Sequence, residues 1–277
     1  MQAANGHTID INGASVYYEI VGSGHPLILI HAGIADSRMW DDQIAAFSKT
    51  YQVIRYDVRG YGKTIRASGP FSTVDDLYKL FVALKISSAY VLGASMGGGI
   101  AIDFTLTHPE MVTALIAVAP ALSGYETPDT FREVWEEIEL AYNAGDFERV
   151  IEMETRMWVD GPKRTPDQVV PHVRARMKTM MTDMIAHQTE QGEPQGIQPT
   201  AVGRLSEIHI PTLLIAGDGD VPYMLDIVNT LEAGISGAKK VIMPGLAHVP
   251  NMEKPQEFNQ IVLDFLKTGD PTTKKAD

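Results

Sequence analysis

One serine of the chain stands in a setting suited to nucleophilic catalysis. Residues 93–97 read Gly-Ala-Ser-Met-Gly, so Ser95 is the central residue of a G-x-S-x-G pattern. The pattern follows an apolar run at 90–92 and precedes a helical pattern at 96–107, which indicates a strand-to-helix turn. The glycines at 93, 97 and 98 would let strand and helix approach closely and leave the hydroxyl exposed. The alternative is a structural turn in which Ser95 caps the helix; the context favours a nucleophile.

A serine hydroxyl needs a neighbouring base whose pKa lies near the working pH, and histidine is the natural candidate. Of the eight histidines, His248 lies in a short loop, residues 244–250, between a late strand pattern and the final helix. His31 ends an early strand and His108 precedes Pro109 at a helix end, so we interpret both as structural. The alternative for His248 is an ordinary surface-loop residue; we predict that it is the general base.

The base in turn needs a carboxylate that fixes its tautomer and stabilises its cation. Residues 217–220 read Gly-Asp-Gly-Asp and follow a strand pattern at 212–216, which leaves two candidates. We prefer Asp220, because a residue past the first tight turn can reach toward the next loop, whereas Asp218 is placed to cap backbone N–H groups within the turn. The order Ser95, Asp220, His248 then follows the chain.

Acyl transfer also requires two backbone N–H donors that stabilise the developing oxyanion. One donor is expected from Met96, which opens the helix after the serine. The second is expected from the loop that follows an early strand, with Gly33 as first choice and Ile34 as second. The alternative for Gly33 is a simple turn residue.

The elements that must position these residues alternate along the chain. Strand patterns at 53–56, 90–92, 115–118, 212–216 and 240–242 alternate with helical patterns at 74–84, 96–107, 224–231 and 257–266. This rhythm predicts βαβ units, hence an α/β fold with a mostly parallel central sheet flanked by helices. A hairpin of strands at 15–20 and 27–30 is expected to open the chain.

The rhythm is interrupted between residues 123 and 205, where helices are expected at 131–141, 147–158 and 169–187. We therefore predict a core domain of residues 1–122 and 206–277 with a helical cap, residues 123–205, inserted in it. Four methionines of the cap share one helix face by their spacing, and a second face carries two more and a tryptophan: Met177, Met180, Met181 and Met184, then Met153, Met157 and Trp158.

These cap residues can be read in two ways. Packing onto the core is the simpler interpretation of the methionines, and a deformable apolar pocket wall is the functional alternative; both readings can hold together. We expect Ile34, Trp158 and Met181 to contact substrate. Arg174 and Lys178, four residues apart, could meet an anionic substrate, although a solvated helix face is the simpler interpretation.

Composition excludes several classes of function. The net charge of −12 and the lack of a long Lys/Arg run argue against nucleic acid as a partner. The absence of cysteine excludes disulfides and thiolate catalysis. The sequence has neither a signal-like N-terminus nor an apolar run of membrane-spanning length, so a cytoplasmic protein without a membrane partner is expected. No metal or other cofactor is expected, and a homo-oligomer is possible.

Several segments together resemble a known family. Residues 31–41, 55–62 and 93–98, with Ala-His-Val-Pro-Asn-Met-Glu-Lys-Pro from 247, are similar to α/β hydrolases of the 3-oxoadipate enol-lactonase and small-carboxylesterase type. The resemblance covers nearly the whole chain and implies the α/β-hydrolase fold with a Ser/Asp/His triad. Ala32 and Ala247 stand where the family often has glycine. We interpret three further residues as structural: Asp57, Arg59 and Gly60.

The expected function is a cofactor-independent serine hydrolase that cleaves a small carboxylic ester or lactone through an acyl-enzyme. Within the same fold, hydrolysis of a C–C bond and perhydrolysis are alternatives. Dehalogenase and epoxide hydrolase activities are disfavoured, because resemblance to the enzymes with those activities would require aspartate at the position of Ser95. A different class of answer is a ligand-binding signalling protein that retains the triad but turns over slowly.

Overall fold

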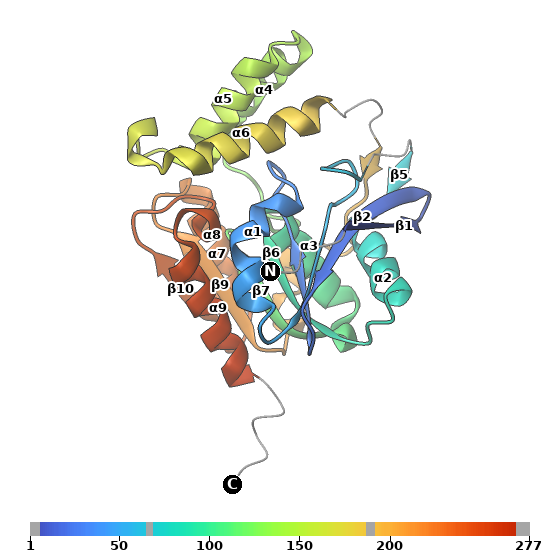
Figure 1. Ribbon diagram of the computed structural model, residues 1–277. Helices are drawn as coiled ribbons and strands as arrows, with labels where there is room; N and C mark the ends of the chain where they lie inside the picture. The colour runs from blue at the N-terminus through green and yellow to red at the C-terminus, as the bar shows by residue number, and fades with distance from the viewer. Residues whose placement is uncertain (1–5, 65–68, 187–191, 270–277) are drawn as a thin grey trace.

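A central sheet of eight strands forms the body of the protein. The computed structural model describes residues 6–64, 69–186 and 192–269. The strand order is β1-β2-β4-β3-β6-β7-β9-β10, and all pairs from β4 to β10 are parallel, whereas β1–β2 and β2–β4 are antiparallel (Figure 1). The strands are β1 Gly6–Ile11, β2 Ala14–Val21, β3 Pro26–Ile30, β4 Gln52–Tyr56, β6 Ala89–Ala94, β7 Val112–Val118, β9 Thr212–Gly217 and β10 Lys239–Met243.

The predicted architecture, a mostly parallel sheet flanked by helices, is confirmed. The inner strands are apolar runs buried on both faces, as a covered parallel sheet requires. Hydrophobic side chains of α2, α3 and α7 pack on one face, and those of α1 and α9 pack on the other. These helices and the short α8 are α1 Asp41–Phe47, α2 Thr73–Ala83, α3 Met96–Thr107, α7 Pro222–Gly234, α8 Pro250–Glu253 and α9 Pro255–Gly269.

The predicted opening hairpin is wrong in its pairing. β2 and β3, which contain the two expected strands, are not neighbours, because β4 lies between them. The hairpin instead joins β1 to β2 through Asn12 and Gly13, which both have positive φ as a tight two-residue turn demands. Residues 22–26 therefore do not close a hairpin. They connect β2 to β3, which lies on the far side of β4 and runs parallel to it.

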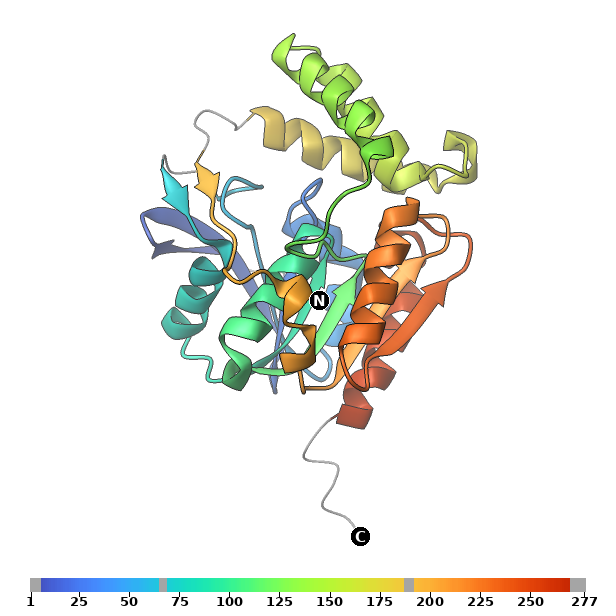
Figure 2. The same cartoon turned by 180° about the vertical axis from the view of Figure 1, so that it is seen from behind.

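The interruption of the strand–helix rhythm corresponds to three helices that lie together above the sheet (Figures 1 and 2). They are α4 Arg132–Asn143, α5 Phe147–Glu154, which continues as a π-helical turn at Thr155–Asp160, and α6 Pro171–Ala186. We call them the cap helices. The predicted helix at 147–158 thus changes type at 155, and residue 187 of the predicted third helix lies outside the described residues.

Two short segments form a separate parallel pair, β5 Pro70–Phe71 with β8 Glu193–Pro194.

The division of the chain into a core and a cap at 123 and 205 stays a prediction. Among the residues that the structure describes, no helix combines the length and the apolar character that a membrane crossing requires.

Candidate active site

Ser95 lies in a sharp turn between β6 and α3. Its backbone has φ 51° and ψ −115°, a region that non-glycine residues rarely adopt, and its side chain makes no capping bond to the helix. A Cβ on Gly93 would overlap the carbonyl oxygen of Gly97, and a Cβ on Gly97 would overlap that of Ile30. The glycines are thus required for the close approach of strand and helix. Ser95 stands at the N-cap position of α3 in a strained conformation, is partly exposed, and does not cap the helix through its side chain.

His248 and Asp220 form a buried pair. The distance between Nδ1 of His248 and Oδ2 of Asp220 is 2.7 Å, and the two side chains are 1% and 0% exposed. The second carboxylate oxygen, Oδ1, accepts the backbone N–H of Val221 at 2.7 Å. Because an ionised carboxylate only accepts hydrogen bonds, Nδ1 of the histidine carries a proton in this pair. Nε2 of a neutral His248 is therefore available to accept a proton from another group.

The topology places these residues at one edge of the sheet. Ser95 follows β6, Asp220 lies three residues past β9, and His248 follows β10, so all three stand beyond the carboxyl ends of parallel strands. This is where open α/β sheets bind ligands. The loop that carries the histidine is fixed to its surroundings, since Gly219 N–H donates to the carbonyl of Leu246 at 2.8 Å.

The other candidates have structural partners. Asp218 is exposed, and its Oδ1 accepts the backbone N–H of Gly245 at 2.6 Å, so it joins two loops rather than capping its own turn as the sequence suggested. Nε2 of His31 accepts the N–H of Val58, and burial lowers the pKa of this imidazole. His108 stacks on the rings of Phe104 and Tyr78.

The expected oxyanion donors lie side by side. The nearest atoms to a Cβ built on Gly33 include Cβ of Met96, at 3.6 Å. Met96 is the first residue of α3, so its N–H has no intrahelical acceptor and lies at the positive end of the helix dipole. Gly33 and Ile34 both line the same pocket, and the choice between them as second donor stays open.

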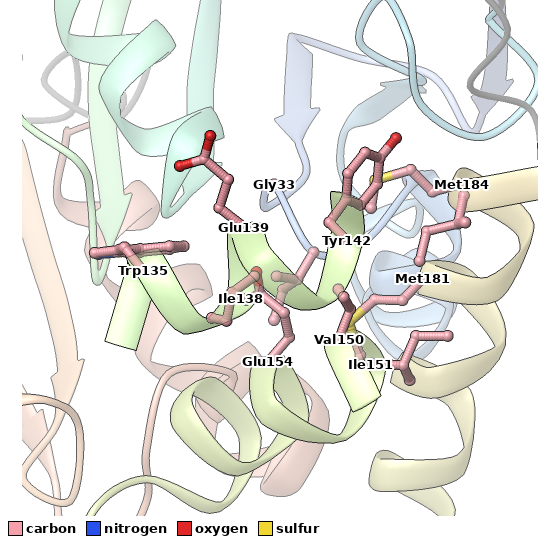
Figure 3. A pocket seen from close by; sticks show the side chains of 12 residues that line it. Gly33, Trp135, Ile138, Glu139, Tyr142, Val150, Ile151, Glu154, Met181 and Met184 are labelled. Atoms are coloured by element: carbon pink, nitrogen blue, oxygen red, sulfur yellow. The ribbon is translucent and has the colours of Figure 1, made fainter. Parts of the chain in front are cut away.

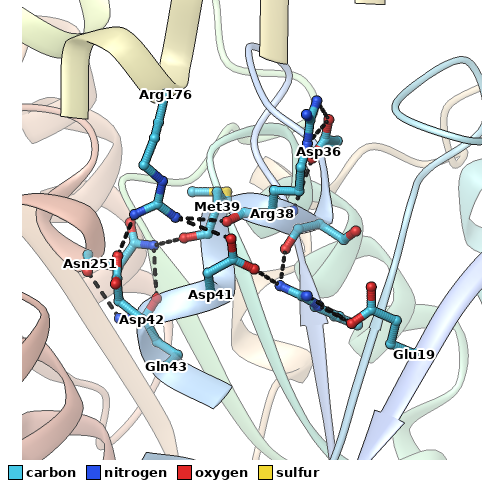
Figure 4. Close-up of polar contacts among 11 residues, drawn as sticks. Glu19, Asp36, Arg38, Met39, Asp41, Asp42, Gln43, Arg176 and Asn251 are labelled. Atoms are coloured by element: carbon cyan, nitrogen blue, oxygen red, sulfur yellow. Dashed lines mark hydrogen bonds and ion pairs between the residues drawn. The ribbon is translucent and has the colours of Figure 1, made fainter. Parts of the chain in front are cut away.

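Polar contacts hold the loop that follows Ile34. Asp57 accepts the backbone N–H groups of Ser37 and Lys63 through its two oxygens, each at 2.8 Å. Arg176 of α6 donates to Asp42 at 2.6 Å and to the carbonyl of Arg38 at 2.9 Å, so a cap helix is tied to this loop (Figure 4). Two further residues have the structural role that the sequence indicated: Arg59 pairs with Asp76 at 2.8 Å, and Gly60 turns with φ 87°.

A pocket of about 370 Å³ lies between the cap helices and the loop at Gly33 (Figure 3). Met181, predicted to contact substrate, lines the pocket and also belongs to the buried apolar core. Met177 and Met180 belong to the same core and do not line the pocket. Both readings of the methionine face therefore apply. The lining residues are Gly33 and Ile34; Trp135, Ile138, Glu139 and Tyr142 of α4; Val150, Ile151 and Glu154 of α5; and Met181, Met184 and Ile185 of α6.

Trp158 connects this pocket to the histidine instead of lining it. Its ring centroid lies 4.4 Å from that of His248, and its carbonyl accepts the backbone N–H of His248 at 3.2 Å. Its indole N–H donates to Oε2 of Glu154 at 2.7 Å. Trp158 sits in the π-helical turn, a distortion that occurs frequently at functional sites.

Arg174 and Lys178 each form ion pairs with acidic side chains of the cap. Arg174 donates to the fully buried Asp160 at 2.8 Å and to Glu152 at 3.1 Å, and Lys178 donates to Glu152 at 2.5 Å. Neither is among the described residues that line the pocket. Within the described part of the chain, no three His, Asp or Glu side chains gather where they could hold a metal ion.

Part of the pocket was missed by sequence reasoning. Trp135, Ile138, Glu139 and Tyr142 stand at i, i+3, i+4 and i+7 of α4, the spacing that marks one helix face. The same spacing pointed to the methionines of α6. A search for mixed aromatic and acidic faces, and not only for apolar ones, would have found these residues.

Comparison with known proteins defines the class of the chain. A family model described as alpha/beta hydrolase fold matches residues 25–255, and the chain belongs to this family. This membership supports hydrolase activity. It also agrees with the sheet order and with the strained serine at the end of β6.

The individual relatives have low sequence identity to this chain. The chain is 28% identical to a putative carbamate hydrolase RutD of Azorhizobium caulinodans, over 91% of this chain and 95% of the relative. It is 26% identical to carboxylesterase YbfK of Bacillus subtilis, over 88% and 80% of the two chains. The enol-lactonase structure from Burkholderia xenovorans LB400 has a TM-score of 0.77 at 24% identity, covering 94% of this chain and 100% of that one, which shows the shared fold.

Proposed function

We propose that the protein is a serine hydrolase that cleaves a small carboxylic ester or lactone through an acyl-enzyme. The observation that carries the proposal is the buried pair of His248 and Asp220 at the same sheet edge as the strained Ser95. Two relatives are named a carboxylesterase and a putative carbamate hydrolase, and these names agree with the proposed chemistry. The cytoplasmic location stays a prediction of the sequence.

Each step uses a group already described. Oγ of Ser95 attacks the ester carbonyl while Nε2 of His248 takes its proton, and Asp220 stabilises the resulting imidazolium. The N–H of Met96 and that of Gly33 or Ile34 stabilise the oxyanion, at about 3 kcal/mol per donor. His248 then gives the proton to the leaving alcohol. Water repeats the sequence on the acyl-serine, which releases the acid and restores the Ser95 hydroxyl.

The test is hydrolysis of short p-nitrophenyl esters by the wild type and by Ser95→Ala. We expect kcat to fall by about 10⁵-fold or more in the variant, because the triad acts as a unit. Ser236→Ala, at an exposed site in the turn after α7, is the matched control and should keep full activity. A covalent adduct of an organophosphate reagent should appear on Ser95 by mass spectrometry of the wild type.

An inert wild type, or a Ser95→Ala variant that is as active as the wild type, would contradict the proposal. Saturable ligand binding without turnover, together with a conformational change in residues 123–205, would then favour the signalling-protein alternative. Turnover of a diketone or of peroxide with an acid, in preference to esters, would move the assignment to C–C hydrolysis or perhydrolysis with the same residues.

A further inference from the structure

The pocket contains a carboxylate that the proposed chemistry does not use. Glu154 is the last residue of α5, is partly buried, and lines the pocket beside Trp158. Its Oε2 accepts the indole N–H of Trp158 at 2.7 Å. Burial raises the pKa of the Glu154 carboxyl, while the bond from Trp158 and the charge of a protonated His248 act in the opposite direction. Among the residues that the structure describes, no Lys or Arg side chain pairs with this carboxylate at the pocket.

Within the described part of the chain, the lack of a Lys or Arg partner at Glu154 is not shared by its acidic neighbour on the same helix. Glu152 lies two positions earlier on α5 and pairs with both Lys178 and Arg174. Among the ion pairs of the described residues, none involves Glu154. The cap thus supplies two cations to Glu152 and none to Glu154, although both stand on the same short helix.

The rest of the pocket wall suits a cation. Trp135 and Tyr142 of α4 line it, and so does Glu139, an exposed second carboxylate; Figure 3 shows Glu139 and Tyr142 projecting to the same side of α4. The described lining residues include no Lys or Arg. Aromatic rings combined with carboxylates recognise alkylammonium groups through cation–π and ionic attraction. An anionic substrate, in contrast, would meet two acidic groups and no basic partner.

We propose that this pocket binds an alkylammonium group of the substrate, with Glu154 as the residue that determines this specificity. The inference rests on the proposed ester hydrolysis and names its substrate class: cationic esters rather than anionic ones. Trp158 couples the two sites, because it bonds to Glu154 and its ring packs on that of His248.

The experiment compares esters that differ only in charge. One pair is butyrylcholine and its dimethylbutyl isostere, with the charge on the alcohol. The other is a p-nitrophenyl butanoate with a terminal trimethylammonium group and its tert-butyl isostere, with the charge on the acyl chain. We expect the wild type to prefer the cationic member of at least one pair by about tenfold or more in kcat/KM. The ratio within a pair cancels general effects on folding and chemistry.

The preference should fall to about twofold or less in Glu154→Gln and persist in Glu152→Gln. The second variant removes the same charge from the same helix, outside the pocket. The preference of the wild type should also decrease as the pH falls through the pKa of Glu154, since only the ionised carboxylate attracts the cation. His248 and Tyr223 interact electrostatically with Glu154, Trp158 bonds to it, and Glu139 and Tyr142 of α4 line the same pocket. The effect of these groups on chemistry is shared by both members of a pair.

The outcomes separate this inference from the hydrolase proposal. Equal rates within both pairs, or a preference that survives Glu154→Gln, would overturn the inference while Ser95-dependent turnover of the neutral esters still supports the hydrolase. Without turnover of any ester, binding of butyltrimethylammonium to Ser95→Ala, followed by tryptophan fluorescence, tests the pocket on its own. Binding that Glu154→Gln weakens by about tenfold supports the inference, and no binding overturns it.

Discussion

The strand-end loops and the cap helices hold their functional side chains by different physical means. Ser95 is placed by backbone geometry, in a turn with φ 51° that only glycine neighbours permit. The cap is tied to the loop at Arg38 by side-chain contacts, such as Arg176 with Asp42 and Arg38 with Asp183, whose side chains are 28–44% exposed. Backbone packing allows few alternatives, whereas exposed ion pairs are weak and adaptable. The chemistry should therefore be sensitive to small changes that the cap tolerates.

The largest effect that tests this difference between the strand-end loops and the cap helices is expected at Asp220. Asp220→Asn should lower kcat by about 10⁴-fold, because an amide in place of the carboxylate favours the wrong tautomer of His248. Steady-state kinetics on a neutral p-nitrophenyl ester measures this loss. Asp218→Asn is the matched control in the same turn, and we expect it to lose less than tenfold. A larger loss in Asp218→Asn than in Asp220→Asn would reverse our choice between the two acids.

A smaller effect, on stability, is expected for the close approach of backbone in the core. A Cβ on Gly97 would meet the carbonyl oxygens of Ile30 and His31, which cannot move without displacing β3. Gly97→Ala should lower the free energy of unfolding by about 3 kcal/mol, as overpacking does. Denaturant titration measures the change. Gly203→Ala, where a Cβ meets no atom within 4 Å, should change stability by less than about 0.5 kcal/mol; equal effects at both sites would contradict the contrast.

Elements set by local sequence were predicted better than contacts between segments that are distant in the sequence. The helix expected at 96–107 has those bounds in the structure, because local signals mark both ends: the G-x-S-x-G turn precedes it and Pro109 follows it. The misassigned hairpin involves strand neighbours, which depend on long-range packing: Gly22–Pro26 reads as a turn whether or not the flanking strands pair.

The contents of the pocket were less predictable. A mixed aromatic and acidic face, such as Trp135, Glu139 and Tyr142 on α4, has the composition of an ordinary solvated helix. Only the placement of α4 over α5 and α6 reveals that it lines a cavity. The pairing of Glu152, and not Glu154, with Lys178 likewise depends on how two helices approach, which helix periodicity alone does not determine.

The smallest effect is expected at the cap contact, and it sharpens the comparison. The ion pair of Arg176 with Asp42 has an N–O distance of 2.6 Å, with side chains 28% and 35% exposed. Arg176→Met should change the free energy of unfolding by less than about 1 kcal/mol, because solvent screens such a pair. We expect KM for a neutral ester to rise by less than about threefold with kcat unchanged. Wild-type KM in about 1 M salt, where the Debye length is about 3 Å, should approach that of the variant. A large fall in kcat would instead mean that the cap contact positions the oxyanion loop, which would place the chemistry, like the selectivity, under the control of the cap.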